Sequence, residues 1–247
     1  MNVSRRLLFA SAFWEVARPR TALNAGHLLI RLTNPAIAFD LRSAADWLRC
    51  HNAARQALAD VLEASRCTVV FAHQWHPIGA AIGEPEVESS TPTFHVFGRW
   101  DGEPVTPGEQ LRLPAQRRVP AAAEELKEYD GGLRAALRRL ASDTAAICHP
   151  ADPDPQITSR APRFKAGAHH TVLAQVSGGP LAPGHLLALA AAVQGLTERP
   201  GVTGLSCVVP EPGADGLEVY AMGRAAGESV NPMQDFLDLP QVSQALL

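Results

Sequence analysis

Short apolar runs separated by turn residues fill the first part of the chain. The runs at 13–17 and 26–32 are joined by a connection that contains proline and glycine, which is the pattern of two strands and a turn. The run at 67–72 is β-branched and apolar, and the run at 94–100 is apolar and aromatic. Both compositions favour strands, so this part of the chain predicts four of them.

A helical pattern lies between these two pairs of runs. Ser43, with Asp46 three residues later, resembles a capping box at the start of a helix. The apolar residues that follow at helical spacing are Trp47, Cys50, Ala54, Leu58 and Val61. Segment 119–145 is also helical in composition, but Gly131-Gly132 predicts a break or a kink within it.

The second half repeats this order in outline, although residue identity between the halves is too low to indicate a repeat. Four prolines make 149–165 the best candidate for a linker. The elements expected beyond it are a strand at 169–176, a helix at 183–196, strands at 202–209 and 217–222, and a terminal helix within 234–247. We therefore predict two domains, 1–145 and 146–247. The second is a smaller α+β half that either duplicates the first or covers it.

Composition and charge narrow the class of protein. The 247 residues are 46% hydrophobic and 19% charged, which is typical of a soluble globular protein. A net charge of -3 gives no positive field, so we expect no nucleic-acid partner. The four cysteines are scattered, which favours neither a disulfide framework nor a cysteine-rich zinc site. The apolar run after Arg5-Arg6 is short for an export signal and no stretch has the length of a membrane span, so we expect a cytoplasmic protein.

Segment 91–99, Thr-Pro-Thr-Phe-His-Val-Phe-Gly-Arg, holds the main chemical candidate. Residues two apart on a strand share a face, so Thr91, Thr93, His95 and Phe97 would line one surface. His95 could act there as an acid, a base or a hydrogen-bond donor to an anion, because an unperturbed imidazole titrates near neutrality. The alternative is that His95 has only a structural role, in which its ring is hydrogen-bonded to the backbone.

This segment resembles the His-φ-His-φ-His motif of the histidine-triad (HIT) superfamily, with Thr91 and Thr93 in place of the first two histidines. Segment 24–30, Asn-Ala-Gly-His-Leu-Leu-Ile, resembles the Gly-His strand of that family, although we expect its histidine to be structural. The order of elements over about residues 5–142 is similar too. The resemblance implies an α+β fold, in which a helix backs an antiparallel sheet, and a nucleotide-like ligand. In the family the middle histidine attacks phosphorus, so its replacement here implies altered chemistry.

Two further residues are catalytic candidates beside His95. Thr93 could be a nucleophile activated by His95, although a strand threonine usually serves packing. His73 falls near the place where the resemblance implies an active-site asparagine. A metal-dependent enzyme is a separate possibility, in which His73, His76 and His95 bind a divalent metal with a glutamate from 84–88. The alternative is that the two histidines of this His-x-x-His pair simply face solvent. Apart from a divalent metal, the sequence indicates no cofactor.

Residues expected to bind a ligand come from loops and from the ends of motifs. They are Thr91, Trp75, His76, Arg99, Arg163 and Lys165. Arg163 and Lys165 belong to a cationic cluster that would reach an anionic ligand if the second half folds over the first. The alternative is an ordinary charged loop. The loop position of Trp75 makes it a candidate pocket wall.

The leading hypothesis is a divergent HIT-like enzyme that acts on a small phosphorylated or nucleotide-derived metabolite without a histidine nucleophile. The frequent alanine, arginine and proline are typical of a high-GC bacterial source and point to specialised metabolism. The alternatives are a non-catalytic protein that binds a nucleotide or another anion and regulates a partner, and the metal-dependent enzyme. We expect a monomeric pseudo-dimer or a homodimer, with no membrane partner.

Overall fold

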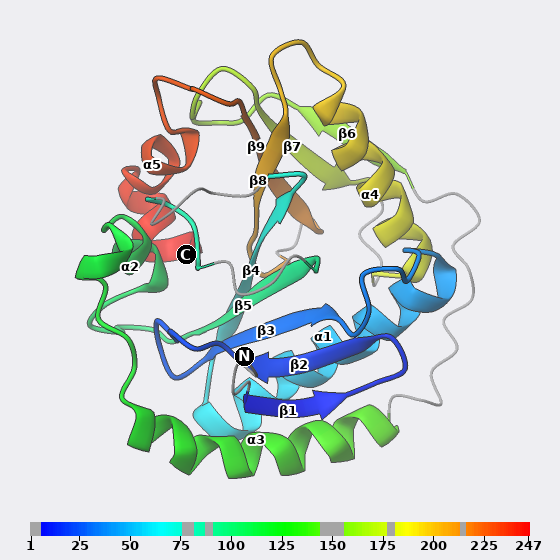
Figure 1. The fold of residues 1–247 in the computed structure, drawn as a ribbon, viewed down its shortest axis with the longest axis vertical. Coiled ribbons are helices and arrows are strands. Elements are labelled where there is room, and N and C mark those ends of the chain that lie inside the picture. Colours follow the sequence, from blue (N-terminus) through cyan, green and yellow to red (C-terminus); the bar gives the residue numbers. More distant parts are fainter. Residues whose placement is uncertain (1–5, 76–81, 87–90, 144–155, 177–180, 213–215) are drawn as a thin grey trace.

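Nine strands form one antiparallel sheet in the computed structural model, which describes residues 6–75, 82–86, 91–143, 156–176, 181–212 and 216–247. The strands are β1 (Arg6–Ala10), β2 (Trp14–Arg18), β3 (His27–Leu32), β4 (Arg66–His73), β5 (Thr93–Arg99), β6 (Ile157–Arg160), β7 (His170–Gln175), β8 (Gly204–Val209) and β9 (Glu218–Arg224). Their order across the sheet is β1-β2-β3-β5-β4-β8-β9-β7-β6 (Figure 1). The α+β class and the antiparallel sheet that the sequence predicts are confirmed.

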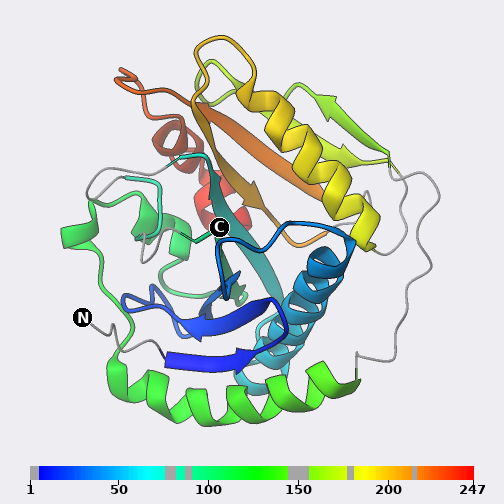
Figure 2. The same ribbon diagram turned by 45° about the vertical axis from the view of Figure 1, so that its right-hand side comes forward.

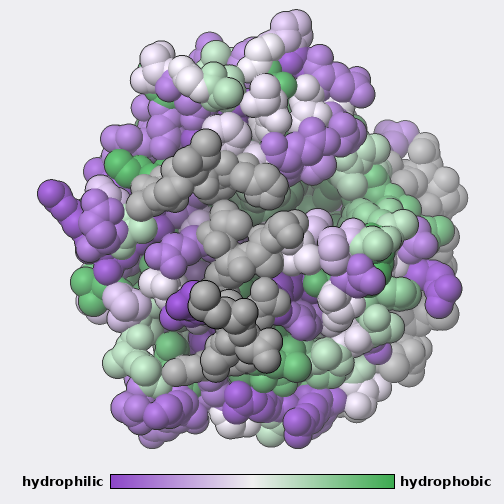
Figure 3. Space-filling view, viewed as in Figure 1, coloured by the Kyte–Doolittle hydropathy of each residue, from purple (hydrophilic) through white to green (hydrophobic). Residues whose placement is uncertain are grey.

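Helices cover both faces of this sheet. They are α1 (Leu41–Leu62), α2 (Pro107–Leu111), α3 (Ala123–Asp143), α4 (Pro183–Thr197) and α5 (Pro232–Leu237), with the shorter segments η1 (Ala115–Arg117) and η3 (Gln241–Leu246). The face that α1 and α4 cover is called the α1 face, and the face that α2, α5 and η3 cover is called the η3 face (Figures 1 and 2). α3 runs along α1 and β1, and its outer side is mostly hydrophilic (Figure 3). Among the described helices, none has the length and apolar character needed to cross a membrane.

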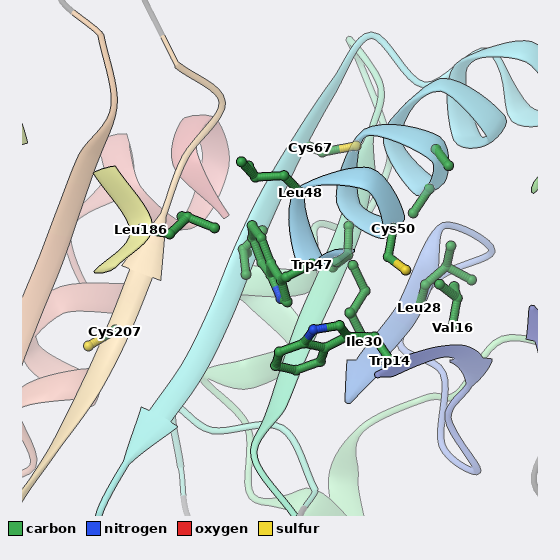
Figure 4. Packing of buried hydrophobic residues seen from close by; sticks show 14 of the residues in the cluster. Trp14, Val16, Leu28, Ile30, Trp47, Leu48, Cys50, Cys67, Leu186 and Cys207 are labelled. Carbon is green, nitrogen blue, oxygen red and sulfur yellow. The ribbon is translucent and has the colours of Figure 1, made fainter. Parts of the chain in front are cut away.

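The larger core lies between the sheet and α1. Alternate residues of β2 and β3 point into it, because side chains two apart on a strand share a face. Trp14 is buried there, and its indole N–H donates to the carbonyl of Ser43 at 2.8 Å. Figure 4 shows residues of this core around α1, among them Trp14, Val16, Leu28, Ile30, Trp47, Leu48 and Cys50. The helical spacing of Trp47 and Cys50 in the sequence therefore marks the buried side of α1.

The start of α1 differs from the sequence prediction. Asp40 is the N-cap, and its carboxylate accepts from the backbone N–H groups of Arg42 and Ser43 at 3.0 and 2.9 Å. Ser43 completes the capping box as the third helical residue, not as its first. Asp46 instead accepts from the Ser11 hydroxyl at 2.7 Å, which fastens α1 to the turn before β2.

α3 continues through Gly131-Gly132, so the predicted break is wrong. A Cβ on Gly132 would lie 3.1 Å from Cγ1 of Val61 on α1. The small residue therefore lets the two helices approach closely, and this packing offsets the low helix propensity of glycine.

Two further predictions in the second half are corrected. Strand β6 lies inside the segment 149–165 that the sequence predicts as a linker. The predicted terminal helix is two short segments, α5 and η3, on either side of Pro240. Proline has no backbone N–H to continue a helical ladder, which accounts for the interruption.

The two halves of the sheet have the same topology and meet at its centre. The first half runs β2-β3-α1-β4-β5 along the chain, and the second runs β6-β7-α4-β8-β9. Their orders in the sheet, β2-β3-β5-β4 and β6-β7-β9-β8, are also the same. β4 pairs with β8, where Val70 lies opposite Val208. The strand order expected in the second half is therefore present, with β6 as an additional strand.

Candidate functional site

The strand that carries the HIT-like motif turns one set of side chains away from α1. Val96 is buried in the α1-face core and Phe97 in the η3-face core. By the alternation of a strand, Thr93 and His95 therefore share the η3 face with Phe97. Within the sheet, His95 lies between Leu29 of β3 and Val70 of β4. The shared face that the sequence predicts for these residues is present.

His95 ends a directional hydrogen-bond chain that begins at the backbone. The N–H of Leu23 donates to Nδ1 of His27 at 3.2 Å, and Nε2 of His27 lies 3.0 Å from Nδ1 of His95. Because Nδ1 of His27 already accepts, the proton of its neutral ring is on Nε2 and is donated to His95. Nδ1 of His95 is therefore an acceptor, which leaves the proton of that ring on Nε2. The chain fixes His95 as a neutral N–H donor.

Burial keeps both imidazoles neutral. Desolvation lowers the pKa of His95 to about 3. Desolvation is the largest cause that lowers the pKa of His27 well below its usual value, followed by electrostatic interaction with His95 and with Arg18. Neither ring carries a charge near neutral pH, so the direction of the chain is preserved there. His27, which the sequence assigns to a structural role, is thus the residue that orients His95.

Near the end of β4, beside His95, the described residues leave the η3 face uncovered at Ala72. Ala72 lies opposite Ser206 of β8, and the register of Phe71 with Phe94 places it opposite Thr93. Ala72 is exposed although β4 is the middle strand of the sheet. Among the described residues, therefore, none packs closely above the Ala72 side chain. Ala72 is therefore the floor of the candidate site, with Thr93 and His95 along one side.

An ion pair extends this side of the site. Arg31 of β3 lies opposite Thr93, and Glu15 of β2 lies opposite Arg31, so the three side chains share the η3 face. Arg31 forms a salt bridge with Glu15. The side chain of Arg31 is 4% exposed and that of Glu15 is 18% exposed. Neither Arg31 nor Glu15 is among the candidates that the sequence predicts. The available signal was that Arg31 lies four residues after His27, on the same face of one strand.

A buried polar cluster forms the other side of the floor. Glu84 accepts hydrogen bonds from Ser206 and Arg224, and burial raises the pKa of its carboxyl. Arg224 also pairs with Glu228. The guanidinium carbon of Arg224 lies 4.6 Å from the centroid of the Trp75 ring, a cation–π contact. Trp75 therefore lies beside this cluster, and its proposed contact with a ligand stays a prediction.

The structure separates His73 from His95. His73 follows Phe71 by two residues, and Phe71 packs against the α1-face core. Its Nε2 lies 3.0 Å from Oε1 of Gln194 on α4. A site that combines His73 with His95 is therefore wrong, because the sheet lies between the two rings. His76 lies outside the described residues, and the described part of the chain contains no group of three metal-ligating side chains.

Thr93 and Arg99 make contacts other than those proposed for them. The Thr93 hydroxyl donates to the carbonyl of Thr91 at 2.8 Å, so it is not bonded to His95 as an activated nucleophile would be. Arg99 is fully buried, where it pairs with Glu103 and donates to the carbonyl of Gln244 at 3.0 Å. Arg99 therefore anchors the C-terminal segment and does not face the floor at Ala72.

Arg163 and Lys165 are exposed in the segment before β7. In the sheet, β8 and β9 lie between β7 and the floor strand β4. Arg163 and Lys165 are therefore separated from His95 by several strands of the sheet. Their contact with a ligand stays a prediction.

Solved structures that resemble part of this chain include two with histidine-triad or HIT-like descriptions. No family model matches the chain, and no curated protein matches it. A HIT-like protein involved in cell-cycle regulation from Bartonella henselae is 16% identical, with a TM-score of 0.36, over 54% of this chain and 88% of that one. A hypothetical histidine triad nucleotide-binding protein from Sulfolobus tokodaii is 13% identical, with a TM-score of 0.39, over 56% of this chain and 87% of that one.

Proposed function

We propose that this chain is a divergent relative of the HIT fold that binds a small phosphorylated or nucleotide-derived ligand over Ala72. The observation that carries the proposal is the chain from Leu23 through His27 to His95, which leaves a fixed N–H donor beside the open floor. A neutral N–H donor suits a phosphate oxygen, since a hydrogen bond to a charged acceptor is stronger than one between neutral groups. Thr93 and Thr91 are neighbouring contacts for the same ligand.

Binding without catalysis accounts for this geometry better than nucleotidyl transfer does. Attack on phosphorus by Nε2 of His95 needs a lone pair on that nitrogen, but the hydrogen bond from His27 holds the proton there. Moving that proton to Nδ1 would set two N–H groups against each other between the rings. If His27 also changed tautomer, its Nδ1–H would instead oppose the N–H of Leu23. The hydroxyl of Thr93 is engaged with a backbone carbonyl. The non-catalytic alternative is therefore the function that we favour over the divergent enzyme.

We infer further that the chain is a monomeric pseudo-dimer whose halves arose by duplication. Segments 98–105 and 223–230 share the pattern Gly-Arg-x-x-Gly-Glu-x-Val. In each, the arginine pairs with the glutamate four residues on. The second glycine of each has a φ of 73°, a left-handed value that favours glycine.

Strands β3 and β7, which begin with His27 and His170, support the same inference. The N–H of Ala166 donates to Nδ1 of His170 at 3.0 Å, as the N–H of Leu23 does to His27. Tyr220, opposite Val208, occupies in the second half the place that His95, opposite Val70, occupies in the first. The hydroxyl of Tyr220 donates to Glu218 at 3.1 Å, so it is already engaged, and we expect one ligand per chain.

The test is ligand binding by a His95→Phe variant. Adenosine and uridine 5′-monophosphates are titrated into the protein by calorimetry, with inorganic phosphate for comparison. Loss of one hydrogen bond to a charged group should weaken nucleotide binding about 10-fold or more. The matched control is Tyr220→Phe, at the equivalent position of the second half, which should bind as the unaltered protein does. Equal affinity of His95→Phe, or capture of a covalent nucleotide on His95, would contradict the proposal.

A further inference from the structure

We propose that Arg31 is the cation that binds the anionic group of the ligand, and that Glu15 is a built-in competitor for it. This inference rests on the proposed function. As a consequence, the site selects singly charged phosphate diesters over doubly charged phosphate monoesters.

Register brings Arg31 to the ligand. Thr93 lies between Arg31 and Ala72 in one row across β3, β5 and β4, and His95 follows Thr93 by two residues on the same face. Diagonal neighbours in adjacent strands are about 7–8 Å apart, which the long side chain of an arginine can span. An anion that accepts from His95 above this row is therefore within reach of the guanidinium of Arg31.

Burial makes Glu15 a strong competitor. The guanidinium of Arg31 is almost fully withdrawn from water, whereas Glu15 keeps more contact with solvent. Attraction between charges is much less screened at such a site than on the surface. A ligand must therefore compete with Glu15 for Arg31 or bind beside it. The carboxylate that neutralises Arg31 also repels each negative charge of the ligand.

On the opposite side of the floor, glutamates offset the positive charge of the arginines. Arg224 is held there by Glu84 and Glu228. Arg118 lies near Glu84 and Glu86. Among the described residues on the two sides, three arginines thus face four glutamates. A second negative charge on the ligand would enter a site without net positive charge, which disfavours a monoester dianion more than a diester monoanion.

The experiment compares two adenine nucleotides that differ in charge. At about pH 8 adenosine 5′-monophosphate is a dianion, because its second pKa is near 6, and adenosine 3′,5′-cyclic monophosphate is a monoanion. Calorimetry should show that the unaltered protein binds the cyclic nucleotide about 10-fold more tightly. Glu15→Gln should tighten binding of the monophosphate by about 10-fold and remove most of that preference. Arg31→Met should weaken binding of both.

Two controls keep the outcomes distinct. Glu218→Gln removes another strand carboxylate that pairs with an arginine, Arg160, and should leave both affinities unchanged. If Arg31→Met does not fold, the double variant Glu15→Gln with Arg31→Met, which leaves no unpaired carboxylate, replaces it. A protein whose nucleotide binding depends on His95 but does not respond to Glu15→Gln overturns this inference and leaves the proposed function standing. Absence of binding of either nucleotide to the unaltered protein overturns the proposed function itself.

Discussion

Replacing Asp130 by alanine should lower the free energy of unfolding by about 3–5 kcal/mol, because it leaves a buried charge without its partner. Nε and Nη2 of Arg18 donate to Asp130 at 3.0 and 2.9 Å, and both side chains are almost fully buried. Nη1 of Arg18 also donates to the carbonyl of His27 at 2.9 Å. The pair therefore joins α3 to the strand that orients His95. Urea unfolding followed by circular dichroism measures the change.

The control for this loss is an ion pair at the surface. Arg139 and Asp60 join α3 to α1, and their side chains are 59% and 34% exposed. Asp60→Ala should lower the free energy of unfolding far less than Asp130→Ala does, since water screens such a pair. The double variant Arg18→Met with Asp130→Leu should recover most of the stability that Asp130→Ala loses, because no buried charge is then left. If Asp130→Ala and Asp60→Ala lowered the free energy of unfolding equally, the buried ion pair would contribute no more to stability than the surface one.

Stability should fall steeply as the pH is lowered from 7 towards 4. Burial lowers the pKa of His95 to about 3 and that of His170 to about 4, and it also lowers the pKa of His27. In the unfolded chain these rings titrate near their ordinary value of about 6.5. Between the two pKa values the unfolded state binds more protons, so acid favours unfolding. Below about pH 6.5, each such histidine lowers the free energy of unfolding by about 1.4 kcal/mol for each unit by which the pH falls.

The measurement is the urea midpoint at a series of pH values. His95→Gln should reduce the slope of stability against pH by the contribution of one histidine, because the glutamine side chain does not titrate. Its amide oxygen can still accept the hydrogen bond from His27. The matched control is His73→Gln, the same substitution at an exposed contact with Gln194, which should alter the slope less than His95→Gln does. A slope that is the same in the unaltered protein and in His95→Gln would refute the buried, neutral state of His95.

Elements with a clear local pattern were predicted well from the sequence. β2, β3, β4 and β5 follow apolar runs, and α1 follows an apolar spacing that its buried side repeats. β6 was missed because its four residues, Ile157 to Arg160, are mostly polar and exposed at the edge of the sheet. The continuity of α3 was missed because the contact of Gly132 with Val61 lies outside the helix itself.

The sequence predicts only part of the candidate site, because the rest depends on contacts between distant segments. His95 and Thr93 share a face because the period of a strand is two, and this can be deduced from one segment. The opposite placement of His73 depends on which face of β4 meets α4, and the loss of the proposed metal site follows from it. Arg31, Glu15 and Ser206 reach the site only through strand pairing, which brings together residues far apart in the chain.

The sequence by itself determined the α+β class, the strands of the motif and the face that His95 occupies, because each of these depends on periodicity within a short segment. Only the tertiary structure decided the protonation of His95, the open floor at Ala72 and the pairing of Arg31 with Glu15. These properties depend on burial and on cross-strand register, and both are set by how distant segments pack together.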